Sequence, residues 1–167
     1  MTIKTKLTPH YDISTNNLKE IINIKSIHWS YSEEQHKNWI NKNLLQDDLH
    51  LLIYESDRLI GYTNLIHTKV MINNNLSSFI GIGNVCTLIS GKGHGNILMQ
   101  SVGDVLLSRD WKGILFCKSY LINYYEKFGW ELLNQEKIID NTNSDINIMT
   151  YNFNEMITSL HYTGRDF

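Results

Sequence analysis

The sequence predicts an α/β fold in which a mixed sheet of about six to seven strands carries helices on both of its faces. Three observations lead to this prediction. Strand-like and helix-like apolar patterns alternate along the chain in the order β-αα-βββ-α-β-α-ββ. A glycine-rich turn at residues 90–96 joins a strand pattern directly to a helix pattern. The 167 residues are enough to bury a substantial core in one domain.

The first half of the chain holds four strand patterns and two helix patterns. Pro9 ends the opening strand, and Ser32 with Gln35 forms a capping-box pattern that starts the second helix. Ser56 and Asp57 form a tight turn between two strands. The expected strands are residues 2–8, 50–55, 58–68 and 78–89, and the expected helices are residues 15–28 and 32–45.

The second half continues with two helix patterns and three strand patterns, and Gly129 is placed to end the second of these helices. Residues 1–153 are therefore expected to form a single domain. The tail at residues 154–167 has weak amphipathic character, which suits either a short helix or a contact in a homodimer. The expected helices are residues 96–107 and 120–128, and the expected strands are residues 113–118, 131–139 and 146–153.

Composition narrows the classes of function. Hydrophobic residues make up 42% and charged residues 19%, and a net charge of −2 provides no basic block for a nucleic-acid backbone. No apolar run approaches the roughly 20 residues of a membrane span, and the N-terminus lacks the apolar core of a signal peptide. The two cysteines lie in apolar runs, and the seven histidines lack metal-ligand spacing. We therefore expect a cytoplasmic protein that binds no nucleic acid, membrane or metal.

The turn Ser90-Gly91-Lys92-Gly93-His94-Gly95-Asn96 carries the clearest functional signal. Its alternate glycines let the backbone turn tightly and approach a ligand without Cβ clashes. The helix that follows directs unbonded N–H groups and its positive dipole end at the turn, and Lys92 adds a charge. This combination predicts a phosphate cradle. The turn fits neither GxGxxG, because Asn96 replaces the last glycine, nor a P-loop, because Lys92 is not followed by Ser or Thr.

A second motif, Tyr124-Tyr125-Glu126-Lys127-Phe128-Gly129-Trp130, lies further along the chain. Together the two motifs resemble those of the GNAT superfamily of N-acetyltransferases, in which a coenzyme A loop follows a strand and a late helix ends in a Tyr-x-Lys-x-Gly-Phe pattern. The element order over residues 2–153 also fits this family. Ser90 stands where the family has Arg or Gln, so one side-chain contact with phosphate is expected to be missing. The matching positions are Gly93, Gly95, Tyr125, Lys127, Gly129 and Trp130.

The resemblance implies both the cofactor and the site. Acetyl-CoA is the expected acyl donor, and the amine of a small molecule is the expected acceptor. Tyr125 takes the position of the tyrosine that often protonates the departing thiolate in this family. Lys118 occupies a place where many relatives have Asn near the cofactor. The pantetheine arm is expected on the backbone of Val85, Cys86 and Thr87, and the pyrophosphate on the amides of Lys92, Gly93, His94, Gly95 and Asn96.

The general base and the acceptor site carry weaker signals. The strand at residues 78–84 has no acid to serve as base. His67 is the leading candidate because it lies on a strand near the sheet centre, and the other candidates are His28, Glu33, Glu34 and Asp48. The link between the first two helices is expected to line the acceptor site. Trp29 and Tyr31 can stack on a sugar or nucleobase, and Glu33 can hold a cationic amine. The same segment also suits purely structural roles in helix capping and core packing.

These inferences predict an acetyl-CoA-dependent N-acetyltransferase that acts on a small amine, with an amino sugar ahead of a polyamine or a peptide or protein amine. Two other functions stay open. One is the transfer of a longer acyl group to the same kind of acceptor. The other is a catalytically silent acyl-CoA-binding module, which the missing acid on the strand favours.

Overall fold

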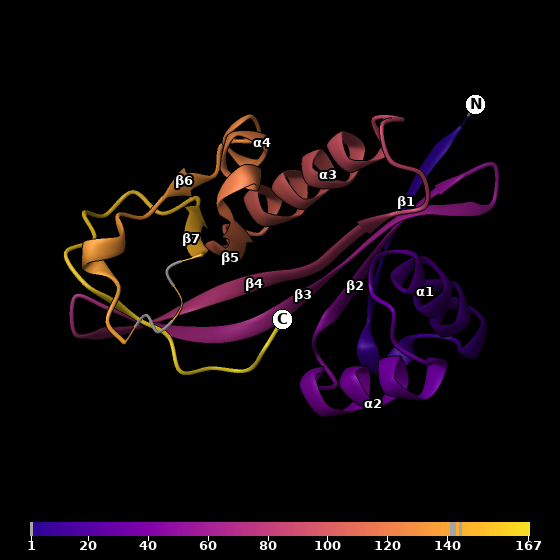
Figure 1. Cartoon of the computed structure of the whole chain (residues 1–167), viewed down its shortest axis with the longest axis horizontal. Coiled ribbons are helices and arrows are strands. Elements are labelled where there is room, and N and C mark those ends of the chain that lie inside the picture. Colours follow the sequence, from indigo (N-terminus) through magenta and orange to yellow (C-terminus); the bar gives the residue numbers. More distant parts are fainter. Residues whose placement is uncertain (1, 141–142, 144) are drawn as a thin grey trace. The chain divides into compact units, whose positions relative to one another are not determined.

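The computed structural model describes residues 2–140, 143 and 145–167, and Figure 1 shows its helices and strands. The observed elements confirm the predicted mixed α/β fold. The strands are β1 (Ile3–Pro9), β2 (Leu49–Glu55), β3 (Arg58–Ile72), β4 (Asn75–Thr87), β5 (Gly113–Lys118), β6 (Glu131–Leu132), β7 (Ile146–Tyr151) and β8 (Leu160–His161). The α-helices are α1 (Thr15–His28), α2 (Glu33–Asn43), α3 (His94–Ser108) and α4 (Ile122–Glu126), and the 3-10 turns are η1 (His10–Asp12), η2 (Ser119–Leu121) and η3 (Gln135–Lys137).

Among the described residues the sheet has eight strands, in the order β1-β2-β3-β4-β5-β7-β6, with β8 paired to β3. β4 and β5 are parallel and pair at Ile80 with Gly113 and at Gly81 with Ile114. The pairs β1–β2, β2–β3, β5–β7 and β6–β7 are antiparallel. The sheet is therefore mixed, as the sequence predicts.

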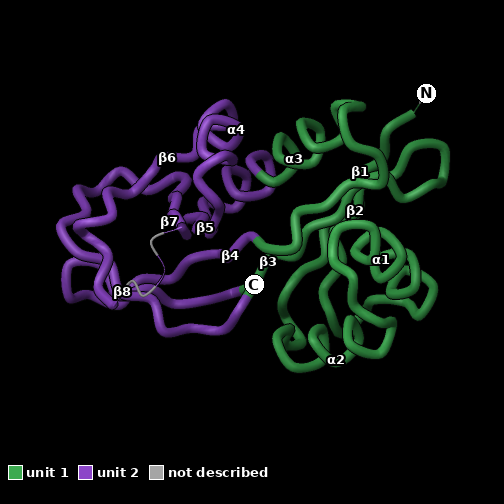
Figure 2. Tube along the Cα trace, in the orientation of Figure 1, with its two compact units in different colours: residues 1–66, 83–102, 167 green, residues 67–82, 103–166 purple. Residues whose placement is uncertain are grey.

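The chain divides into two compact units, which Figure 2 distinguishes by colour. Unit 1 comprises the residues up to 66, residues 83–102 and residue 167, and unit 2 comprises residues 67–82 and 103–166. The elements β3, β4 and α3 each run from one unit into the other.

Unit 1 has helices on both faces of its strands. On one face, α1 and α2 cover Leu52, Tyr62 and Cys86, which belong to one cluster of buried side chains. On the other face, a Cβ built on Gly61 would lie 3.7 Å from the Leu98 Cβ, so α3 packs closely over β3. Burial of this apolar surface is the main source of stability for such a layer.

Side-chain caps set the starts of α1 and α2. The Ser14 hydroxyl accepts a hydrogen bond from the Asn17 amide at 3.1 Å. The Ser32 hydroxyl accepts one from the Gln35 amide at 3.2 Å, and the Gln35 side-chain oxygen accepts one from the Ser32 amide at 2.8 Å. The capping box predicted from the sequence is therefore present. It fixes the start of α2 directly after the link that was expected to line the acceptor site.

Unit 2 is built around β5 and β7. The Trp130 side chain is 2% exposed and packs so closely on Gly113 that a Cβ built there would lie 2.7 Å from the Trp130 ring. Gly129 has φ +84, and its amide donates to the Glu126 carbonyl at 3.0 Å, which ends the turn after α4. Only glycine adopts this conformation without strain, so the predicted role of Gly129 is confirmed.

Three segments in the second half of the chain differ from their predicted structure. The strand expected at residues 131–139 is limited to β6, because the Asn134 side chain accepts from the Glu136 amide at 3.0 Å and starts η3. The tail at residues 154–167 contains β8 and no helix. Its approach to β3 is fixed by Asn73, whose side-chain oxygen accepts from the Thr158 amide at 2.7 Å. The helix expected at residues 120–128 is the shorter α4, preceded by η2.

Candidate functional site

The glycine turn lies between β4 and α3 and opens outward. Gly91 and Gly93 have φ +76 and +77, and a Cβ built on either would have no atom within 4 Å. α3 begins at His94, and the Gly93 carbonyl accepts from the Asn96 amide at 3.0 Å. The first amides of a helix lack partners within the helix. The turn therefore leaves open space beside a helix N-terminus, which is compatible with the anion cradle expected from the sequence.

The side chains of the turn differ in exposure. Lys92 and Asn96 are exposed, so their polar groups are available to a ligand at the rim. His94 is 9% exposed, and its Nδ1 is buried with no hydrogen-bond partner among the described residues. A buried polar atom of this kind usually has a protein or water partner in a native structure. The turn therefore combines the exposed amine of Lys92 with a buried nitrogen of His94 that makes no hydrogen bond to the described residues.

The strand segment at residues 85–87 places its central side chain inward. Cys86 is 2% exposed and faces α1, while Val85 and Thr87 are half-buried. Burial raises the pKa of Cys86 to about 12, so its thiol stays neutral and unreactive. Asn84, at φ +52 in the same strand, donates from its side chain to the Asn64 side-chain oxygen at 2.9 Å. This left-handed residue makes the strand irregular where the segment begins.

The end of α1 is attached to the same strand segment. The His28 Nε2 atom lies 2.6 Å from the Thr87 carbonyl oxygen and 3.3 Å from the Thr87 amide nitrogen. The imidazole thus contacts the carbonyl and amide of Thr87, which were expected to pair with the pantetheine arm. A ligand that pairs with Thr87 has to displace His28.

The three residues expected to bind the acceptor have different surroundings. Trp29 packs against the cluster beneath α1 and α2. Tyr31 is 59% exposed, and its ring stands edge-on to His36 at a centroid distance of 5.6 Å. Glu33 is exposed and pairs with Lys37, which holds the pKa of its carboxyl below the usual range. Tyr31 and Glu33 are therefore accessible to a ligand, whereas Trp29 has a packing role.

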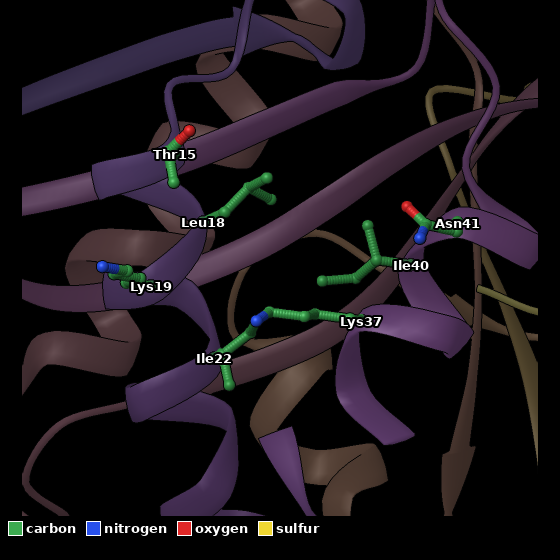
Figure 3. A pocket seen from close by; sticks show the side chains of 7 residues that line it. All are labelled: Thr15, Leu18, Lys19, Ile22, Lys37, Ile40 and Asn41. Atoms are coloured by element: carbon green, nitrogen blue, oxygen red, sulfur yellow. The ribbon is translucent and has the colours of Figure 1, made fainter. Parts of the chain in front are cut away.

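A groove between α1 and α2 has a cavity volume of about 200 Å³, and Figure 3 shows the side chains around it. Its lining is mostly apolar and includes two lysine side chains, Lys19 and Lys37. No carboxylate lines it, so the groove is poorly suited to a cationic amine. Its lining residues are Thr15, Leu18, Lys19, Ile22, Lys37, Ile40 and Asn41.

Tyr125 lies in unit 2, near the end of α4, and is 7% exposed. Burial, followed by the effects of Cys117, Tyr124 and Tyr120, raises its pKa above the usual value of 10. The Tyr124 ring stands edge-on to the Tyr125 ring at 5.2 Å. The phenol is consequently protonated at neutral pH.

His67 also lies in unit 2, on β3, and is exposed. Its ring meets Trp111 edge-on at a centroid distance of 5.3 Å. Its carbonyl oxygen accepts from the Arg165 guanidinium at 2.8 Å. Tyr125 and His67 thus belong to unit 2, whereas the glycine turn, residues 85–87 and the expected acceptor residues belong to unit 1.

Buried polar residues of unit 1 were missed by the sequence reasoning. His50 contacts both His10 and Tyr62 through its two ring nitrogens, at 3.0 and 2.9 Å. Lys25 is 3% exposed, and its amine lies 4.3 Å from the centre of the Trp39 ring. Burial lowers the pKa of Lys25 to about 8. The sequence signal for His50 and Lys25 was a polar residue at a position where the apolar pattern of its strand or helix faces inward.

Among the described residues, no group of three or more His, Cys, Asp and Glu side chains is placed to hold a metal ion. None of the helices in residues 2–140 and 145–167 combines the length and apolar character needed to cross a membrane.

The fold is similar to that of several solved structures. PH1933 from Pyrococcus horikoshii superposes with a TM-score of 0.65 at 16% identity, covering 91% of this chain and 100% of that one. ElaA from Escherichia coli gives 0.63 at 19% identity, covering 90% and 99%. The PaiA N-acetyltransferase from Thermoplasma acidophilum, solved in complex with coenzyme A, gives 0.56 at 18% identity, covering 92% and 100%.

A comparison with curated protein sequences found no match. The family model for the acetyltransferase (GNAT) domain matches residues 12–133. This match includes the strand segment, the glycine turn and Tyr125, and it extends over most of the chain. The protein therefore belongs to the GNAT family of acyltransferases.

Proposed function

We propose that this acyltransferase moves an acetyl group from acetyl-CoA to the amine of a small molecule, with amino sugars as the first acceptor class. The observation that carries the cofactor assignment is the open glycine turn, in which Gly91 and Gly93 leave room at the N-terminus of α3. Amides and a positive dipole end favour a pyrophosphate there. The residues proposed to hold the cofactor are Val85, Cys86, Thr87, Lys92, Gly93, His94, Gly95 and Asn96.

The proposed reaction is attack of the neutral amine on the thioester carbonyl, followed by loss of the coenzyme A thiolate. Tyr125 serves as a hydrogen-bond donor to the departing sulfur. Complete proton transfer would be uphill, because burial raises the pKa of Tyr125 above 10, while a thiol titrates near about 8.5. The phenol therefore stabilises the thiolate, and solvent protonates it after release. Tyr125 is thus proposed to donate only a hydrogen bond, whereas the resemblance implies that it donates a proton.

The acceptor class rests on Tyr31, which is exposed between α1 and α2, and on Glu33, the exposed first residue of α2. An exposed phenol ring can stack on a sugar face, and a carboxylate attracts an ammonium group. Glu33 already pairs with Lys37, so a bound amine has to replace that lysine. His67 remains the proposed base from unit 2, where its ring is exposed beside Trp111.

The cofactor assignment is tested by calorimetric titration with acetyl-CoA and with a longer acyl-CoA. Absence of binding would refute the proposal. Thiol release is then measured with glucosamine, spermidine and a peptide amine as acceptors. The fastest turnover is expected with the amino sugar. Binding without thiol release from any amine would instead support a silent acyl-CoA-binding module.

Tyr125→Phe is expected to lower kcat by about 10²- to 10³-fold, the range for loss of one donor to a developing charge. Acetyl-CoA affinity should change little. Tyr124→Phe is the matched control, because Tyr124 contacts its neighbours through its ring. Unaltered turnover in Tyr125→Phe would remove this residue from the mechanism.

A further inference from the structure

Three side chains of unit 1 form a continuous hydrogen-bonded line. The Tyr62 hydroxyl lies 2.9 Å from His50 Nδ1, and His50 Nε2 lies 3.0 Å from His10 Nδ1. Tyr62 and His50 are 1% and 0% exposed, whereas His10 in η1 is half-buried. The line therefore connects the interior beneath α1 and α2 with a position that reaches solvent.

The surroundings keep the line neutral at rest. Burial lowers the pKa of His50 to about 3 and raises that of Tyr62 well above 10. Asp48, itself 1% exposed, favours positive charge on both histidines. Lys25 disfavours positive charge on His50, and Cys86 is the titratable neighbour of Tyr62. A proton passing along the line is thus destabilised by burial in the middle, while Asp48 favours it at the outer histidine.

A neutral line of this kind has two hydrogen-bond polarities. In the first, Tyr62 donates to His50 Nδ1, and His50 Nε2–H donates to His10 Nδ1. In the second, His10 Nδ1–H donates to His50 Nε2, and His50 Nδ1–H donates to the Tyr62 oxygen. Uptake of one proton by Tyr62 and release of one from His10 Nε2 convert the first arrangement into the second and leave the number of protons in the line unchanged. Such a line can conduct a proton.

The inner end of the line lies beside the strand segment that is proposed to hold the pantetheine arm. Tyr62 shares a buried cluster with Cys86, and the Leu88 amide donates to the Ile60 carbonyl at 2.9 Å. The arm would run from the glycine turn back along β4, which brings its thioester end toward Asn84. Asn64, on β3 two residues after Tyr62, bonds Asn84.

Asn64 is completely buried, and its Nδ2 atom has no hydrogen-bond partner among the described residues. Buried donors are satisfied in nearly all native structures. A polar atom of the acceptor, or a water molecule that accompanies it, is therefore expected at this position. This acceptor atom or water molecule would lie on the same sheet face as Tyr62.

We propose that Tyr62, His50 and His10 carry a proton to solvent. This proton is the one that the acceptor amine releases when it attacks the thioester beside β4. This inference rests on the proposed function. As the C–N bond forms and the C–S bond breaks, the amine proton passes to the Tyr62 oxygen. The Tyr62 proton moves to His50 Nδ1, the His50 Nε2 proton moves to His10 Nδ1, and His10 releases its Nε2 proton to water. The three residues act as a relay in place of an acid on β4, and in this inference they also replace His67 as the acceptor of the amine proton.

The first test uses both ends of the line. His10→Ala is expected to lower kcat at least tenfold at neutral pH, and added imidazole should restore it in proportion to its concentration. Tyr62→Phe should lower kcat similarly without rescue, because its position is buried. General-base assistance typically contributes about 10²- to 10⁴-fold, which leaves room for such losses. Tyr54→Phe is the matched control, since the Tyr54 hydroxyl bonds Asn17 and Glu20 instead.

The second test needs no turnover. Nitrogen NMR of the histidine rings in the intact protein should show His50 neutral from pH 5 to pH 8. Tyr62→Phe should change the tautomer of His50. A His50 that titrates near pH 6.5, or full activity in both relay variants, would overturn the relay alone. A wild-type protein that releases no thiol with any amine would overturn the proposed function together with the relay.

Discussion

Substitution of Gly93 by Ala separates backbone strain from ligand binding. Gly93 has φ +77 and open space around a built Cβ, so an alanine fits without a clash and retains only the strain of the left-handed conformation. That strain costs an L-residue about 1–2 kcal/mol. A loss of 1 kcal/mol lowers Tm by about 2–4 °C in a chain of this size, so a fall of about 2–8 °C is expected. Differential scanning fluorimetry measures it.

The same substitution should weaken acetyl-CoA binding beyond its effect on stability. The new methyl group projects into the space proposed for the pyrophosphate, and a tenfold loss of affinity corresponds to about 1.4 kcal/mol. Gly91→Ala is the matched control, because Gly91 has φ +76 and equally open surroundings. Both variants should lose similar Tm, and Gly93→Ala alone should lose affinity in calorimetric titration. Equal affinity in the two variants, or a stronger loss in Gly91→Ala, would refute the placement of the pyrophosphate.

Three further predictions concern stability. Gly113→Ala should lower the free energy of unfolding by about 1–3 kcal/mol, because its Cβ would lie 2.7 Å from the Trp130 ring. Gly61→Ala is the control and should cost little, because the nearest atoms to its Cβ lie at 3.7 Å. Equal losses of the two variants in urea unfolding would contradict this prediction. Ser32→Ala should cost about 1 kcal/mol through loss of the capping box, and an unchanged Tm would argue against it. Because burial lowers the pKa of His50 to about 3, its contribution is complete above pH 6.5 and falls as the pH drops toward 3. Urea unfolding of His50→Gln should therefore show a shallower acid slope than wild type, by up to about 1.4 kcal/mol per pH unit, and identical slopes would disprove it.

Local chemistry explains which parts of the fold could be predicted. Ser32 with Gln35 and the glycine at position 129 act on backbone groups within a few residues, so their effects are visible in sequence. β8 depends on Asn73 binding the Thr158 amide, 85 residues away in the chain. No pattern within residues 154–167 encodes that contact.

The site shows the same division. The glycine turn was predictable because its geometry follows from alternate glycines and the helix that comes next. The His10–His50–Tyr62 line was not, since it joins residues 40 and 12 positions apart and exists only once β2 and β3 are paired in register. The roles of Tyr125 and His67 remain predictions.

The two cysteines make the protein convenient for the assays proposed above. Cys86 and Cys117 are 2% and 5% exposed, and burial raises the pKa of both thiols. A thiol reagent such as Ellman's should therefore react with released coenzyme A but not with the buried cysteines of the folded enzyme. Unfolding exposes both sulfur atoms, so a burst of two thiols per chain measures the denatured fraction in the same cuvette. One reagent thus reports turnover and the integrity of each variant at once.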